Sequence, residues 1–267
     1  MTLPVGLQLY SVRDELEKDF YATIKKVKEM GYDAVELCGL GHMDPLEVRR
    51  MLDEVGLFCN SSHCPTDEMK KEGTFAKYKA AGLDYIVVPW MSYGSDHRRL
   101  KENLELIRTL AEEAKKEGLT LLYHNHDFEF EREGEETIID TIYSTIPEDL
   151  LQTELDTCWV KFAGSDPCEY IRKYTGRSPI VHLKDFWEDA NFDSCPYDLI
   201  GKTREERENE GFEFRPIGHG IQDIPAILKA SIDAGAKWII VEQDESKNRP
   251  SLESAKMSID YLRSFEW

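Results

Sequence analysis

A short unit recurs along this chain and limits the folds that the chain can adopt. In each copy a helical segment ends at a glycine, and a short run of apolar, β-branched or aromatic residues follows almost at once. Glycine ends a helix in the left-handed conformation, so that the chain turns directly into a strand. The five glycines of this pattern are Gly31, Gly56, Gly82, Gly118 and Gly235. The pattern predicts alternating helices and strands.

The segments between the apolar runs have the spacing of helices. In residues 20–27, 100–114 and 252–262, apolar residues recur at steps of three and four, which places them on one buried face. Asp44 and Asp166 are each followed by proline, a pattern typical of a helix N-cap and first turn. The strands read as continuous apolar runs, which suit a parallel sheet covered on both faces.

The number of strands selects one architecture. We expect strands at residues 5–10, 34–37, 57–61, 85–89, 120–124, 151–155, 180–183 and 238–242. Eight such βα units in a chain of 267 residues predict a single-domain (β/α)8 TIM barrel. An open doubly wound sheet is less well supported, because no GxGxxG loop follows the first strand. A long insertion after strand 7, residues 186–222, is expected to shape the active site.

Charge and composition exclude several classes of protein. The chain has 33 Lys and Arg against 52 Asp and Glu, a formal net charge of −19 that disfavours nucleic acid and anionic membranes as partners. It has no apolar run long enough to span a bilayer and no signal segment, so we expect a cytoplasmic protein. Its six cysteines form no CxxC pair and are expected to be reduced thiols.

Polar residues gather where the predicted strands end. The active site of a TIM barrel lies at these carboxyl ends. Four histidines, an aspartate and a glutamate end or directly follow apolar strands: His63, His124, His126, His182, Asp156 and Glu242. A lone histidine at a strand end is usually structural, but four of them converging on one barrel mouth favour a functional site.

Four of these residues form a predicted metal site. His124, Asp156, His182 and Glu242 hold matching positions on the fifth to the eighth strand. Imidazole and carboxylate together suit one divalent cation such as Mn²⁺, Co²⁺, Zn²⁺ or Fe²⁺, with Mg²⁺ also compatible, better than Ca²⁺. An open coordination position would admit substrate.

Five motifs in order resemble a known family. Residues 6–13, 123–130, 155–159, 182–185 and 218–223 are similar to the sugar phosphate isomerase/epimerase group of the xylose isomerase-like TIM barrels. The resemblance implies a divalent metal held by residues from the last four strands. Two departures stand out: His124 replaces the commonest carboxylate, and His219 stands where similar sequences often have Glu.

The resemblance also implies a reaction. It is isomerisation or epimerisation of a sugar, keto-sugar or sugar derivative, by proton abstraction next to a carbonyl through a metal-stabilised enediolate. Glu242 is expected to act as ligand and base, with His126 as its catalytic partner or as a group that orients the ligands. Substrate contacts are expected from a further set at strand ends: Glu36, His63, Trp159, Lys184 and Glu129, with Trp90 near the mouth.

Alternatives remain at this stage. The same chemistry begins a dehydration or β-elimination of a keto-inositol or 3-keto-glycoside. Less favoured are an endonuclease IV-like DNA repair enzyme, which the charge of −19 opposes, and a non-catalytic sugar-binding barrel. No phosphate-binding glycine loop is present, so a neutral sugar is as compatible as a sugar phosphate. A small carbohydrate is the expected partner, and a homo-oligomer is compatible with the sequence.

Overall fold

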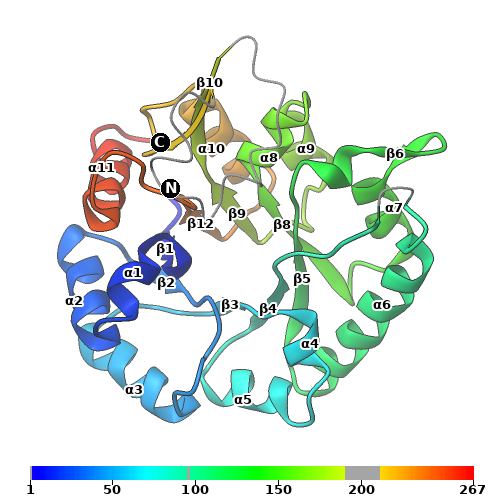
Figure 1. Cartoon of the computed structure of the whole chain (residues 1–267), viewed down its shortest axis with the longest axis horizontal. Coiled ribbons are helices and arrows are strands. Elements are labelled where there is room, and N and C mark those ends of the chain that lie inside the picture. The colour runs from blue at the N-terminus through cyan, green and yellow to red at the C-terminus, as the bar shows by residue number, and fades with distance from the viewer. Residues whose placement is uncertain (1, 95–96, 190–210) are drawn as a thin grey trace.

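A computed structural model describes residues 2–94, 97–189 and 211–267. Its main sheet has eight parallel strands surrounded by helices (Figure 1). In spatial order the strands are β2 (Ala34–Glu36), β1 (Val5–Gln8), β12 (Trp238–Val241), β9 (Ile180–Leu183), β8 (Leu151–Asp156), β5 (Thr120–His124), β4 (Tyr85–Val88) and β3 (Ser61–His63). Parallel bridges from Ala34 to Phe58 and from Leu37 to Ser62 join the two ends. The predicted (β/α)8 TIM barrel is confirmed.

Helices cover the outside of the barrel (Figure 1). They are α1 (Arg13–Leu16), α2 (Phe20–Met30), α3 (Pro45–Val55), α4 (Thr66–Met69), α5 (Thr74–Ala80), α6 (Leu100–Lys116), α7 (Ile138–Thr145), α8 (Thr157–Phe162), α9 (Pro167–Lys173), α10 (Ile224–Asp233) and α11 (Ser251–Arg263). The five glycines of the repeat have φ from 75° to 104°, as predicted for residues that end a helix. Asp44 and Asp166 are the N-caps of α3 and α9, as predicted.

Strand alternation explains where the site lies. Ile180, Leu122 and Ile240 belong to an apolar cluster of buried strand residues. The residue two positions further along each strand lies on the same side, one layer nearer the carboxyl end. These residues are His182, His124 and Glu242. The sequence therefore changes from apolar to ionisable within one layer of the barrel.

The third strand differs from its prediction. We expected residues 57–61, but β3 is Ser61–His63 and Phe58 makes only an isolated bridge to β2. The apolar residues before Ser61 suggested the strand, yet the paired residues are polar, and Ser61 and Ser62 are fully buried. Hydrophobic periodicity cannot detect a buried strand built from serine and histidine.

The insertion after β9 begins and ends with paired strands. β10 (Asp185–Glu188) pairs antiparallel with β11 (Phe212–Arg215), and residues 190–210 lie outside the described part of the chain. A shorter ribbon, β6 (Arg132–Glu133) with β7 (Glu136–Thr137), follows β5. In the described ranges the cysteines are free, and no helix is long and apolar enough to cross a membrane.

Candidate metal centre

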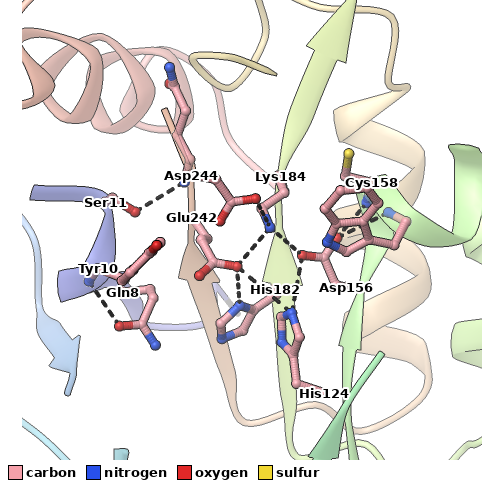
Figure 2. A network of polar contacts seen from close by, with 12 residues as sticks. Gln8, Tyr10, Ser11, His124, Asp156, Cys158, His182, Lys184, Glu242 and Asp244 are labelled. Carbon is pink, nitrogen blue, oxygen red and sulfur yellow. Dashed lines mark hydrogen bonds and ion pairs between the residues drawn. The ribbon is translucent and has the colours of Figure 1, made fainter. Parts of the chain in front are cut away.

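Four side chains from neighbouring strands converge at the carboxyl end of the barrel. His124, Asp156, His182 and Glu242 each offer one ligand atom, and these atoms lie within 4.8 Å of one another. His182 Nδ1 is 3.1 Å from Glu242 Oε2, and His124 Nε2 is 3.6 Å from Asp156 Oδ2. All four side chains are buried. Figure 2 shows them pointing toward one another. The spacing and the mixed nitrogen and oxygen donors fit one divalent cation.

Asp156 is oriented by the backbone around it. Its Oδ1 accepts hydrogen bonds from the backbone N–H of Cys158 (2.8 Å) and Trp159 (3.2 Å), because Asp156 is the N-cap of α8. Its own N–H donates to Asn125 Oδ1 at 3.0 Å. Its Oδ2 is buried, and the Lys184 ammonium lies 3.0 Å from it. That oxygen therefore already faces a positive charge, as a metal ligand would.

An ammonium group lies beside these carboxylates. Strand alternation places Lys184 on the same side as His182, and its Nζ is 3.0 Å from Asp156 Oδ2 and 2.9 Å from both Glu242 Oε2 and Asp244 Oδ2 (Figure 2). Burial lowers the pKa of Lys184, but the three carboxylates outweigh burial and raise the pKa well above its usual value. Lys184 is therefore a buried cation.

A second set of donors lies against the first and shares two of its rings. His63, His124, Glu154 and His182 also bring ligand atoms within 4.8 Å of one another. His124 Nδ1 is 3.1 Å from Glu154 Oε2, and His182 Nε2 is 2.9 Å from Glu36 Oε1. Each shared ring thus turns one nitrogen toward each set.

His124 and His182 belong to both sets, which argues against one cation in each set bound through these same two histidines. A neutral imidazole that gives one nitrogen to a cation keeps a proton on the other nitrogen. Glu154 of the second set and the neighbouring Glu36 lie where they can accept those protons from His124 and His182. This arrangement orients ligating histidines in metal sites generally.

Glu154 and the neighbouring Glu36 differ in charge. Burial and the neighbouring charge of Glu154 raise the pKa of Glu36 to about 7. Burial also acts to raise the pKa of Glu154, but His182 and His63 outweigh it and hold that pKa well below its usual value. Glu154 is therefore the ionised member of the pair near neutral pH.

A cavity of about 270 Å³ opens beside the metal-site residues. It is lined by Tyr10, Cys38, His63, Pro65, Pro89, Trp90, His124, His126, Lys184, Glu242 and Asp244. Burial, with the nearby His124 and Lys184, lowers the pKa of His126 well below its usual value, so that its ring is neutral. The cavity has room for a molecule about the size of one sugar ring and offers it imidazole, ammonium and carboxylate groups.

Three predicted substrate contacts lie behind the wall of this cavity. Glu36 accepts a hydrogen bond from Gln8, Glu129 accepts one from the Tyr123 hydroxyl at 2.6 Å, and both glutamates are fully buried. Trp159 is fully buried too, with its ring 5.2 Å from Lys184 Nζ. Glu36, Glu129 and Trp159 are thus absent from the residues that line this cavity, and direct contact of these three with substrate stays a prediction.

The remaining predicted site residues border the cavity. His63, His126, Lys184 and Glu242 line it, as does Trp90. Sequence reasoning gave no role to Asp244, which lies beside Lys184. The sequence feature that could have identified Asp244 is its position two residues beyond Glu242, on the same side of an extended chain.

The motif at 218–223 supports the site from outside the cavity lining. Asp185 Oδ2 accepts hydrogen bonds from the N–H of Gly218 (3.0 Å) and Gly220 (2.9 Å), and Asp185 Oδ1 accepts one from the N–H of Gln222. A Cβ on Gly220 would lie 2.1 Å from Asp185 Oδ1, so only glycine fits there. His219, the departure from the family pattern, is exposed.

Comparisons with known proteins show the family of this chain. The family model described as xylose isomerase-like TIM barrel matches residues 24–265. An inosose dehydratase from Geobacillus kaustophilus is 27% identical, over 90% of this chain and 85% of its own length. One from Clostridium perfringens is 31% identical over 62% of this chain and 54% of its own length.

Solved structures share the fold. A sugar phosphate isomerase/epimerase from Parabacteroides distasonis has a TM-score of 0.79 and 23% identity, covering 98% of each chain. An IolI protein with a bound zinc atom has a TM-score of 0.71 and 14% identity, covering 97% of this chain and 96% of its own.

Proposed function

We propose that this chain, which belongs to the xylose isomerase-like TIM barrel family, is a divalent-metal-dependent isomerase or epimerase of a sugar, keto-sugar or sugar derivative. It would remove a proton from the carbon next to a carbonyl and return a proton elsewhere. One observation carries the proposal: two imidazoles and two carboxylates meet within 4.8 Å beside a cavity of about 270 Å³.

Four residues would hold the cation. They are His124 through Nε2, His182 through Nδ1, Asp156 through Oδ2 and Glu242 through Oε2. The convergence of these buried donors, with Asp156 Oδ2 beside the Lys184 ammonium, supports this assignment. A bound dication supplies Lewis acidity, which polarises a carbonyl oxygen and makes the neighbouring C–H more acidic. Glu154 and Glu36 would fix the orientation of the two histidine rings.

His126 and Glu242 are the proposed proton-transfer groups. Both line the cavity. The backbone N–H of His126 donates to Glu129 Oε2 at 2.8 Å, and its ring stacks on Phe128 with centroids 5.4 Å apart. These contacts hold the neutral ring of His126 in place, which suits a general base. Glu242 would take or return the second proton.

Lys184 would stabilise negative charge on the substrate. Its ammonium lines the cavity and lies against three carboxylates. It would donate a hydrogen bond to a substrate oxygen that gains negative charge as the proton leaves.

A dehydratase is the second candidate, and the sequence relatives favour it. Relatives named inosose dehydratase align with most of this chain. Dehydration of a keto-inositol begins with the same proton abstraction and then needs an acid for the departing hydroxyl. Lys184 or protonated His126 would supply that proton.

Isotope exchange tests both candidates. The metal-loaded protein would be incubated in D₂O with ketoses, their phosphates, a keto-inositol and 3-keto-glycosides, and the products analysed by mass spectrometry. Deuterium in recovered sugar supports the isomerase or epimerase, and loss of water supports the dehydratase. Exchange that persists with chelator, or that His126→Ala leaves at the parent rate, would overturn the proposed mechanism. Lys161→Gln, an exposed change on α8, is the control.

A further inference from the structure

A second cavity adjoins the first at the same end of the barrel. It measures about 420 Å³ and is formed by residues that follow β4 and β5. Trp90 lines both cavities, and its side chain is 43% exposed. A large aromatic surface left this open at the border of two cavities is suited to a ligand.

The border between the cavities consists of aromatic rings. The rings of Trp90 and Phe128 meet edge to face with centroids 6.4 Å apart. Phe128 lines the second cavity and stacks at an interplanar angle of 2° on His126, which lines the first. A molecule lying across this border would therefore place one part beside His126 and another part beside Phe128.

The walls of the second cavity suit a neutral ring. Trp90, Tyr93 and Phe128 contribute aromatic side chains, and no Lys or Arg is among the described residues that line it. Its ionisable lining groups include Glu131 and His97, and Glu131 lies 2.6 Å from His97 Nε2. Aromatic faces bind the C–H faces of sugars and aryl rings, whereas a carboxylate disfavours phosphate and other anions.

One residue that lines the second cavity, His97, has an uncommon backbone conformation. His97 has a φ of 54°, in the left-handed region that non-glycine residues seldom adopt. Its Nδ1 is 3.0 Å from Glu133 on β6, so that His97 ties the residues after β4 to those after β5. Strained residues of this kind concentrate at ligand sites.

We propose that the second cavity is a subsite for a neutral ring attached through a glycosidic oxygen to the sugar in the first cavity. The substrate class would then be glycosides with a sugar or aryl aglycone, rather than free monosaccharides. The assignment of the first ring to the reaction cavity rests on the proposed function, whereas binding in the second cavity does not.

The test compares one-ring and two-ring probes. Affinities for methyl and phenyl D-glucopyranosides, in both anomers, and for cellobiose and maltose would be measured by calorimetry. We expect at least one two-ring probe to bind roughly tenfold more tightly than its methyl counterpart. The gain should be lost in Ser92→Trp, which fills the second cavity, and kept in Trp187→Ala, which removes an exposed ring on β10.

Two outcomes would overturn the inference. One is equal affinity, within about twofold, for all methyl, phenyl and disaccharide probes. The other is a gain that survives in Ser92→Trp, provided that circular dichroism shows the variant folded and that it binds the methyl glycosides as the parent does. Failure of the proposed function would appear separately, as absent deuterium exchange with an unchanged preference for two-ring probes.

Discussion

Replacing Lys184 by glutamine should tighten metal binding, the reverse of what removing a residue from a metal site usually does. The Lys184 ammonium lies 3.0 Å from Asp156 Oδ2 and 2.9 Å from Glu242 Oε2, the oxygens that we propose as ligands. An incoming dication must either share these two oxygens with the ammonium or displace the ammonium from them. Glutamine keeps much of the side-chain volume and removes the charge.

The size of the effect follows from the charges. Two unit charges about 4 Å apart interact by about 4 kcal/mol at an effective dielectric constant of about 20. Asp244, 2.9 Å from Lys184 Nζ, offers the ammonium a place to remain when a cation enters, which reduces the cost. We therefore expect Lys184→Gln to bind Mn²⁺ or Zn²⁺ about 10 to 100 times more tightly, or about 1.4 to 2.8 kcal/mol.

The assay is competition with a fluorescent chelator after the protein has been stripped of metal. Lys161→Gln makes the same charge change at an exposed site and should leave the affinity within about twofold of the parent. Lys184→Arg keeps the charge and should show no tightening. Equal or weaker binding by Lys184→Gln would refute the reasoning, because the ammonium would then not compete for the ligand oxygens.

Three further predictions concern the site and its support. Asp156→Asn and His182→Ala should lower the metal occupancy measured by mass spectrometry, whereas His126→Ala should keep the metal and slow turnover. Loss of metal from the His126 variant would show that His126 is a ligand. Glu36→Ala should weaken metal binding about 10- to 100-fold by the same chelator assay, because it removes the acceptor that orients His182, and unchanged affinity would contradict that role. Burial raises the pKa of Glu129 from 4.5 to about 8, so between these values the folded protein keeps a proton that the unfolded chain loses, and stability falls as pH rises. Glu129→Gln should remove this loss, roughly 1 kcal/mol for each pH unit, in urea unfolding with chelator at pH 5 to 8; parallel pH profiles of variant and parent would contradict it.

The strands that sequence located best are those with apolar runs ending in a polar residue. Predicted and found bounds agree for β5 and β9, where such runs end at or next to a histidine. β3 was misplaced because its buried residues are serines and a histidine, whose burial depends on neighbouring strands distant in sequence. Local periodicity has no access to that information.

The site was predictable to the level of which residues converge. Strand ends in a closed barrel meet at one mouth, so His124, Asp156, His182 and Glu242 were found from position alone. The depth of each side chain in the barrel, and which side chains pair with each other, were not predictable. Glu36 lies behind His182, and Lys184 pairs with Asp244 across a separation of 60 residues, because barrel closure brings β9 beside β12.

Anomalous diffraction from crystals of the metal-loaded protein tests the central claim most directly. We predict one divalent cation per chain, bound by His124 Nε2, Asp156, His182 Nδ1 and Glu242, with Glu154 and Glu36 accepting from the far nitrogens of the two rings. A cation bound instead by His63 and Glu154, or none at saturating Mn²⁺ or Zn²⁺, would contradict the account.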